Sequence, residues 1–156
     1  LEDRSALMKQ LFVNAYKNAQ IKEVLPKFFI KMGRFHTMRG NSPNAVYEIG
    51  NLTHELATFN DTKDLNISIL GRFFYDEEEK RVIDNLEYNS QWVKSFMPFY
   101  KAGKQDQWTI IDLRPLKEAW INRKYIFNAY LKGRLKTHDL IIIPPVDYDP
   151  IPNYEN

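Results

Sequence analysis

The sequence predicts a mainly helical fold: a compact bundle of about five helices with a small two-stranded β element and an extended proline-rich C-terminal arm. Two observations carry this expectation. Apolar residues recur every three to four positions over several long segments, which is the period of an α-helix. Four of the eight prolines lie between residues 144 and 152, where they exclude regular helix. We therefore expect one domain over residues 1–139 and an arm over residues 140–156.

Two helices are expected in the N-terminal quarter of the chain. The first, over residues 5–19, places Leu7, Leu11, Phe12, Ala15 and Tyr16 on one face. The second, over residues 21–38, has Pro26 near its start, where proline is tolerated. The apolar positions of this second helix are Val24, Leu25, Phe28, Phe29, Met32 and Phe35.

The middle of the chain predicts two further helices and two short strands. A helix over residues 44–59 follows the start signal Ser42-Pro43. Alternating apolar residues over 65–70 predict a strand, with a short buried helix as the alternative. Four carboxylates at residues 76–79 suit the first turn of a helix that runs to Met97, where Pro98 ends it. A second strand, over residues 108–111, is expected to pair with the first.

A long final helix is expected over residues 116–136. Its apolar side repeats at helical spacing, and Gly133 weakens its last turn. The residues of that side are Leu116, Trp120, Phe127, Leu131 and Leu135.

No catalytic or cofactor-binding motif can be written from the residues. The chain has no cysteine, which removes disulfides, thiolate metal ligands and thiol nucleophiles. The three histidines, His36, His54 and His138, lack the close spacing of a metal-binding helix. The glycines are scattered singly and form neither a phosphate-binding nor a dinucleotide-binding loop. We therefore expect no catalytic residue, no metal and no cofactor, and an enzyme of unrecognised class ranks third among the functional hypotheses.

Charge is segregated along the chain, although the formal net charge is only +2. Residues 1–39 and 114–136 are strongly basic, residues 48–87 are acidic, and the arm has carboxylates but no basic residue. In both basic stretches the cations alternate with aromatic rings. The candidate contact residues for nucleic acid or a partner are Lys27, Lys31, Arg34, Arg39, Arg123, Lys124, Tyr125, Tyr130, Lys132, Arg134 and, in the arm, Tyr148.

Two interpretations of the basic stretches stay open. The cations can be the solvated side of each helix and the rings its core side. Alternatively, the two helices form one positive face for phosphate backbones, with Tyr125 or Tyr130 stacking on bases. The arm likewise either docks onto a partner or lies across the protein's own basic helices.

The leading functional hypothesis is a non-enzymatic interaction or assembly domain. It would dock a protein partner, or a second copy, through the basic aromatic helices and the acidic arm. The alternative is a nucleic-acid-binding accessory factor that contacts the phosphate backbone through the lysines and arginines of the second and last helices. No apolar run is long enough to span a membrane, so no membrane partner is expected. The lack of cysteine favours an intracellular location, cytoplasmic or nuclear, with secretion as the alternative.

Overall fold

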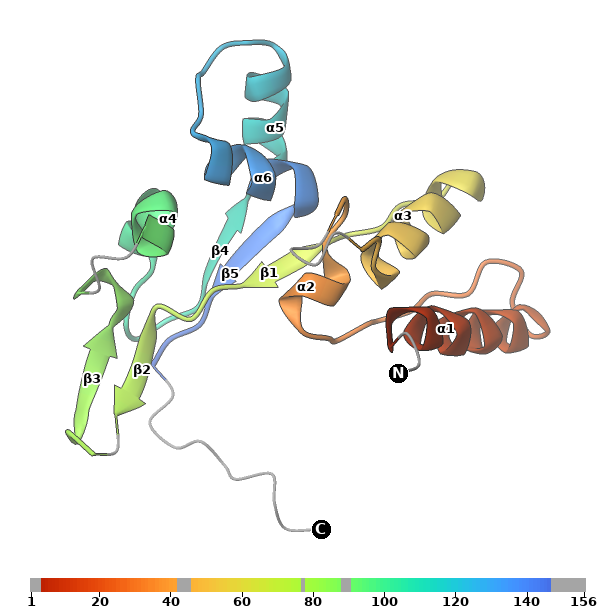
Figure 1. Cartoon of the computed structure of the whole chain (residues 1–156), viewed down its shortest axis with the longest axis horizontal. Coiled ribbons are helices and arrows are strands. Elements are labelled where there is room, and N and C mark those ends of the chain that lie inside the picture. The colour runs from red at the N-terminus through yellow and green to blue at the C-terminus, as the bar shows by residue number, and fades with distance from the viewer. Residues whose placement is uncertain (1–3, 42–45, 77, 88–90, 147–156) are drawn as a thin grey trace. The chain divides into compact units, whose positions relative to one another are not determined.

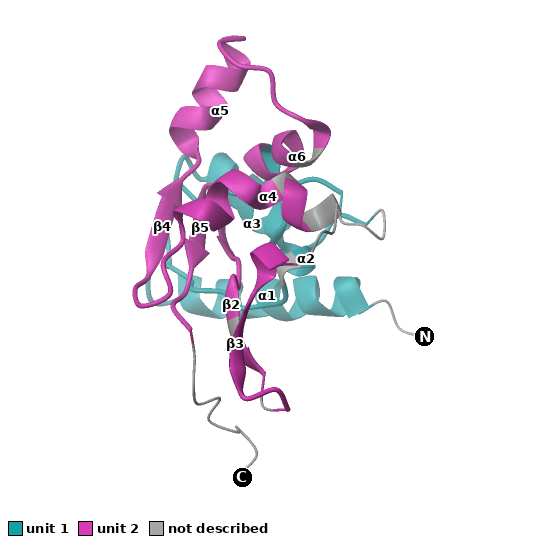
Figure 2. Ribbon diagram, turned by 90° about the vertical axis from the view of Figure 1, so that its left-hand side faces the viewer, with its two compact units in different colours: residues 1–66, 136–138 teal, residues 67–135, 139–156 magenta. Residues whose placement is uncertain are grey.

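The computed structural model describes residues 4–41, 46–76, 78–87 and 91–146. The chain divides into two compact units, coloured separately in Figure 2. Unit 1 comprises residues 1–66 and 136–138, and unit 2 comprises residues 67–135 and 139–156. The fold is mixed α/β, with helices, a three-stranded sheet and a β-hairpin, so the expectation of a mainly helical bundle is correct only for the helices.

Unit 1 is helical. Helix α1 (Arg4–Gln20) confirms the first predicted helix, α2 (Arg34–Thr37) is a single turn, and α3 (Ile49–Phe59) forms the C-terminal part of the helix predicted over 44–59. The Ser42-Pro43 start signal lies outside the described residues. At the end of α3 the chain turns through Asp61, whose φ is 50°. The N–H groups of Asp61 and Thr62 donate to carbonyls of the last helical turn, and these two bonds close the helix.

The helix predicted over residues 21–38 is wrong for most of its length. Residues 26–33 follow a path without regular secondary structure, and only the turn of α2 is helical. Pro26 lies at the sixth position of the predicted helix rather than in its first turn, so it removes a needed N–H donor and restricts Leu25 to extended backbone. The cations and rings of this stretch therefore follow an irregular path instead of a helix face.

Gly50, in the first turn of α3, sits where the backbone of α2 passes closest. A Cβ atom at Gly50 would lie 2.1 Å from the carbonyl oxygen of Thr37 and 2.7 Å from that of Met38. The Thr37 carbonyl also accepts a hydrogen bond from the Asn66 side-chain amide, which holds it in place. Only glycine allows this approach of two backbones.

We expect Gly50→Ala to lower the free energy of unfolding by about 1–3 kcal/mol, because the added methyl group must push α3 away from α2. Gly133 is the matched control, because it lies inside α6 (Ala129–Thr137) and a Cβ atom added there would meet nothing within 4 Å. Gly133→Ala should instead stabilise by about 0.5–1 kcal/mol through helix propensity. Urea unfolding followed by circular dichroism measures both, and equal effects of the two substitutions would contradict the close approach at Gly50.

Unit 2 contains a mixed sheet in the order β1-β5-β4. Strand β1 (Ile67–Ile69) pairs in parallel with β5 (Leu140–Ile143), and β4 (Thr109–Asp112) pairs antiparallel with β5, as Figure 1 shows. Both predicted strands thus exist, but the expectation that they pair with each other is wrong. They flank β5, whose four apolar residues were expected to begin the arm. The residues beyond Val146 lie outside the described part of the chain.

The helix predicted from residue 76 is wrong at its start. Strands β2 (Phe73–Asp76) and β3 (Arg81–Asp84) form a hairpin, and in its antiparallel register Asp76 lies opposite Arg81. The Asp76 carboxylate accepts the N–H groups of Glu78 and Glu79, so it organises a turn rather than a helix start. Aromatic and β-branched residues on both sides of this turn favour strands.

The helical part of that prediction begins later and ends later than expected. A 3-10 turn (Asn85–Glu87) precedes α4 (Gln91–Ala102), which contains Pro98 instead of ending there. Phe96, Phe99 and Tyr100 of α4 are buried in the core of unit 2, together with Leu135, Ile141 and Ile143. Burial of these large side chains outweighs the one helical hydrogen bond that Pro98 removes.

The final helix is interrupted where one continuous helix was predicted. Helix α5 (Arg114–Ile121) and α6 are separated by residues 122–128. The N–H groups of Arg123 and Lys124 donate to the carbonyls of Trp120 and Ala119, which closes α5. Asn128 then caps α6, because its side-chain oxygen accepts the N–H of Leu131.

Candidate functional site

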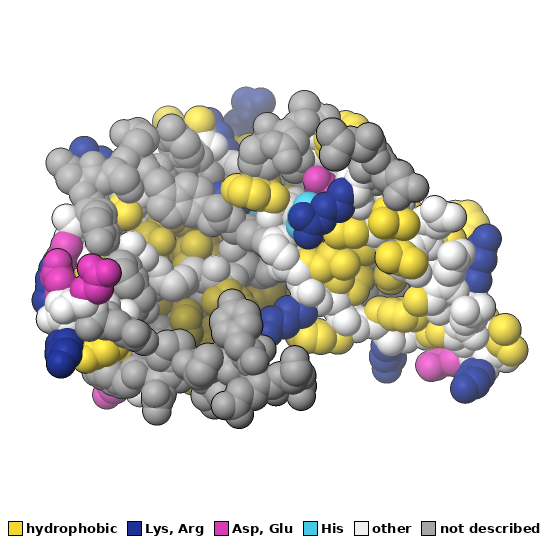
Figure 3. Space-filling model, turned by 60° about the horizontal axis from the view of Figure 1, so that its bottom comes forward, with side chains coloured by type: hydrophobic (Ala, Val, Ile, Leu, Met, Phe, Trp, Pro, Cys, Tyr) yellow, Lys and Arg dark blue, Asp and Glu magenta, His cyan; other side chains and the backbone are white. Residues whose placement is uncertain are grey.

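Unit 1 carries an open apolar groove between α1 and residues 29–32. Its cavity volume is about 300 Å³. In Figure 3, hydrophobic side chains gather on the face where α1 and the segment after it lie. The residues that line the groove are Met8, Leu11, Phe12, Phe29, Ile30, Lys31, Met32 and Ile49. We refer to this set as the apolar groove.

Aromatic contacts hold the segment after α1 against the helix. The Phe28 ring lies 5.5 Å from the Phe12 ring and 5.7 Å from the Tyr16 ring, measured between centroids. Phe12 and Tyr16 are one turn apart on α1 and belong to the apolar stripe expected from the sequence. Phe28 packs against this stripe. This packing leaves the neighbouring ring of Phe29 88% exposed.

The exposed apolar area extends past the groove itself. Leu11 is 59% exposed, Leu7 44% and Val24 80%. Several large apolar side chains that are exposed within one short stretch of chain, in contrast to single scattered residues, favour a binding surface. The spacing of these side chains predicts a helix core, so sequence reasoning missed the groove. The signal that could have revealed it is Pro26, which is incompatible with the helix that would have buried them.

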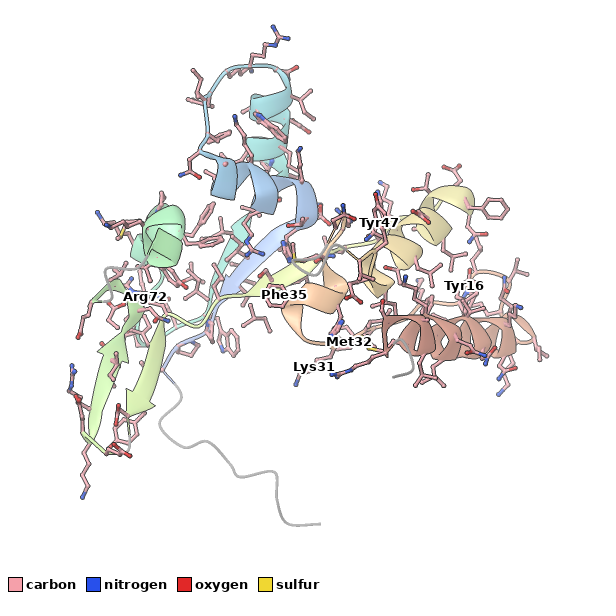
Figure 4. The ribbon with its side chains drawn as sticks, in the orientation of Figure 1. Tyr16, Lys31, Met32, Phe35, Tyr47 and Arg72 are labelled. Carbon is pink, nitrogen blue, oxygen red and sulfur yellow. The ribbon has the colours of Figure 1, made fainter. Side chains whose placement is uncertain are left out.

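The groove lies on a basic stretch of the chain. Between residues 4 and 33 the chain has six lysines and arginines and a single acid, Glu23. Lys31 lines the groove and Lys27 is exposed two residues before Phe29. Figure 4 shows Met32 reaching toward α1 while Lys31 extends away from it. An occupant of the groove would thus meet apolar walls and the positive charge of Lys31, and we call Lys31 and Lys27 the rim cations.

Unit 1 also contains a buried polar cluster around Glu48. Glu48, whose side chain is 4% exposed, accepts a hydrogen bond from Ser5 Oγ at 2.8 Å, and His36 Nδ1 lies 3.1 Å from the same carboxylate oxygen. The cluster joins the start of α1, the turn α2 and the residue before α3. Ser5 and His36 thus share one carboxylate oxygen of Glu48.

A second polar cluster ties Arg39 and His54 to one carboxylate. Arg39 Nε and Nη2 donate to Asp64 at 3.0 and 2.8 Å, and His54 Nδ1 lies 2.8 Å from the other oxygen of Asp64. The third histidine, His138, is fully buried, with Nδ1 2.7 Å from Thr137 Oγ1. Within the described part of the chain, no group of three or more His, Asp or Glu side chains is placed to hold a metal ion.

Unit 2 presents a different exposed surface over residues 121–126, from the last residue of α5 into the connection to α6; we call it the loop of residues 121–126. Ile126 is 98% exposed, Ile121 73% and Tyr125 61%, and Arg123 and Lys124 are exposed beside them. The Tyr125 ring packs against the Phe127 ring, with 6.2 Å between the two ring centroids. Phe127 in turn packs on the core of unit 2 and so supports the loop.

The structure separates the sequence-predicted contact residues into several groups. Lys27 and Lys31 are exposed on unit 1, and Arg123, Lys124 and Tyr125 are exposed on unit 2, with Lys132 half-buried. Arg39 is bound to Asp64 and 12% exposed, and Arg134 is buried with its guanidinium 5.1 Å from the Phe96 ring. The side chains of Arg34 and Tyr130, and all of Tyr148, lie outside the described structure.

Sequence reasoning also missed a charged clamp in unit 2. Arg72 donates to both carboxylate oxygens of Asp84, and also to the carbonyls of Tyr100 and Gly103 at the end of α4. The guanidinium lies 4.4 Å from the Phe73 ring. It thereby joins the hairpin to α4. The partners are far apart in sequence, so no spacing pattern could have revealed the clamp.

Comparisons of this chain with protein-family models, with curated proteins and with solved structures find no match. Among the helices that the structure describes, none is both long and apolar enough to cross a membrane.

Proposed function

We propose that this chain is a non-enzymatic interaction domain that binds a protein partner, or a second copy of itself, through the apolar groove of unit 1. The observation that carries the proposal is the exposure of Phe29 and Leu11 at the edge of an open groove with a basic rim. Burying such side chains contributes about 1.5–3 kcal/mol each, so an occupant that covers both would be held chiefly by the hydrophobic effect. The lysines at the rim would select an occupant that carries acidic residues. The cysteine-free composition is our reason for placing this binding inside the cell.

The test is a selection from a displayed library of random peptides against the intact protein. We expect enriched peptides that combine apolar or aromatic residues with acidic ones and bind with a dissociation constant of about 10–100 µM. Phe29→Ser should weaken these peptides by about tenfold or more, since an exposed aromatic anchor contributes over 1 kcal/mol to a typical interface. Fluorescence anisotropy measures the affinities.

Phe59→Ser is the matched control. Phe59 is 87% exposed, like Phe29, but it lies at the end of α3 and does not line the groove. The control should leave peptide affinity unchanged. A selection that yields no peptides, or peptides that bind the Phe29→Ser protein as tightly as the original, would rule out the groove as a binding site.

A second function, contact with nucleic acid through the loop of residues 121–126, is favoured by the backbone of Arg123. Its φ is 54°, in the left-handed region that glycine adopts without strain and that costs other residues about 1 kcal/mol. Asp61 has a similar φ of 50° where it closes α3, so the backbone of Arg123 supports a role for its side chain only together with the exposed cation that it presents. Lys124 and the supported ring of Tyr125 beside it offer a phosphate contact and a stacking surface.

Arg123→Gly should therefore raise the free energy of unfolding by about 0.5–1 kcal/mol and lower the affinity for single-stranded DNA or RNA. Fluorescence polarisation at two salt concentrations measures binding, which must weaken as salt rises. Lys104→Ala, at another exposed cation of unit 2, is the control and should change affinity less. Absent or salt-insensitive binding of the original protein would remove the nucleic-acid hypothesis.

A further inference from the structure

The acidic C-terminal segment of residues 147–156 has the composition of a groove ligand. Pro150 and Pro152 lack N–H donors and restrict the residues before them, so the sequence favours polyproline II backbone here. Polyproline II has three residues per turn. Tyr148, Ile151 and Tyr154 are spaced by three, and this spacing would place all three apolar side chains along one edge.

The charges of this segment complement the rim of the groove. It contains Asp147, Asp149 and Glu155 and no lysine or arginine. Residues 4–33 supply seven of the eight residues that line the groove, and this stretch has six cations and one acid, with Lys31 in the groove lining. The groove also offers what polyproline II ligands bind elsewhere, an aromatic-lined channel: Phe12 and Phe29 line it, and Phe28 packs next to them.

The segment leaves unit 2 from a defined point. Val146 is 8% exposed and its N–H donates to the carbonyl of Gln105 at 3.0 Å, so the chain is held to unit 2 up to that residue. The ten residues that follow can extend for at most about 33–36 Å. The three apolar side chains of the segment would span about 19 Å of this length if it binds in polyproline II.

We propose that the apolar groove binds residues 147–156 of a second copy of this chain. Tyr148, Ile151 and Tyr154 would bury against the groove, and the carboxylates beside them, Asp147, Asp149 and Glu155, would face Lys27 and Lys31. This inference rests on the proposed function, and it names the occupant of the groove. Receptor and ligand are different surfaces of one chain, so the contact is heterologous and each copy can engage two neighbours. Association therefore either closes, with a reciprocal dimer as the smallest ring, or continues into longer assemblies as the concentration rises.

The test uses two full-length variants, each lacking one half of the contact. A groove variant, Leu11→Ser with Phe29→Ser, keeps the segment, and a segment variant, Tyr148→Ser with Ile151→Ser and Tyr154→Ser, keeps the groove. Sedimentation velocity over a range from about 1 to 500 µM is expected to show the original protein associating in a concentration-dependent way. Each variant alone should associate at least about tenfold more weakly.

Mixing the two variants gives the decisive result. The groove variant can only donate its segment and the segment variant can only accept one, so the mixture should form a one-to-one complex and nothing larger. Raising the salt concentration should weaken this complex, because the rim contacts are between exposed charges. The controls are Phe59→Ser for the groove and Asn153→Ser for the segment, and neither should change association.

Three outcomes would overturn the inference. An original protein that stays monomeric across the concentration range would do so, as would association that the segment variant leaves unchanged. The third outcome is a protein that stays monomeric and whose segment variant binds the selected groove peptides more tightly than the original protein does. This result would mean that the segment occupies the groove of its own chain and not the groove of a second copy. If groove peptides are selected and their binding is lost in the Phe29→Ser protein, but the original protein does not self-associate, the proposed function stands and only this inference is wrong. If no peptide is selected and no association occurs, both fall.

Discussion

Replacing Phe96 with alanine is expected to lower the free energy of unfolding by about 3–5 kcal/mol, the largest effect of any single substitution we propose. The side chain is 1% exposed and lies in the core cluster of unit 2. Its ring contacts the rings of Phe99 and Tyr100, each at 6.4 Å between centroids, and the guanidinium of Arg134 at 5.1 Å. Truncation leaves a cavity and also removes the ring that faces a buried charge.

Urea unfolding followed by the circular dichroism signal measures this loss. Phe29→Ala removes the same atoms from a side chain that is 88% exposed, so it should change stability by less than about 0.5 kcal/mol. The two substitutions thereby separate stability from binding, since Phe29 is the residue expected to affect peptide affinity. A Phe96→Ala protein as stable as the Phe29→Ala protein would contradict the described core.

Replacing Arg72 with methionine is expected to cost about 2–4 kcal/mol. The arginine side chain is 14% exposed and that of Asp84 24%. Removing the guanidinium leaves the Asp84 carboxylate and the carbonyls of Tyr100 and Gly103 without this donor. Arg81→Met is the matched control in the same hairpin. Arg81 also pairs with two carboxylates, but its side chain is 50% exposed, so its loss should cost little.

The Arg72 clamp also predicts a pH dependence. Burial raises the pKa of Asp84, but the hydrogen bonds from Arg72 and from the N–H of Leu86, with the charge of Arg72, outweigh it and leave the pKa below its ordinary value. A carboxylate with a lowered folded-state pKa stabilises the protein above its unfolded pKa of about 3.9, and this contribution is lost as the pH falls through the folded pKa. Asp84→Asn should therefore be less stable than the original at neutral pH.

The difference between the two proteins should shrink as the pH falls from about 4 through the lowered folded-state pKa of Asp84, below which both proteins have a neutral side chain at position 84. Urea midpoints measured from neutral pH into the acid range test this. A difference in stability between the two proteins that stays constant across the whole pH range would mean that protonation of Asp84 does not weaken the clamp.

The sequence reliably indicated elements that are locally determined. The apolar spacing of Leu7, Leu11 and Tyr16 located α1, and alternating or short apolar runs located β1 and β4. These elements depend on periodicity and on residues near to each other in the chain. The candidate contact residues Lys27, Lys31, Arg123, Lys124 and Tyr125 are likewise exposed, as polar or amphipathic side chains in basic stretches tend to be.

Local rules failed where a turn or a distant partner decided the structure. The four carboxylates at residues 76–79 suit a helix start, yet Asp76 turns the chain into a hairpin whose second strand supplies Asp84 to Arg72. Pro98 predicts a helix end, yet packing of Phe96 and Tyr100 carries α4 past it. In each case the tertiary contacts contribute more free energy than the local preference costs.

By itself, then, the sequence determined where charge lies along the chain, where the first helix and two of the strands form, and that thiol chemistry is absent. Only the tertiary structure decided that Leu140–Ile143 is the central strand of a sheet, since its partners come from residues 67–69 and 109–112. The tertiary structure also decided that Phe29 and Leu11 border an open groove rather than a helix core. The physical reason is common to both: a strand's place in a sheet and a side chain's burial depend on which distant segment packs against it, and the spacing of residues along the chain does not encode that partner.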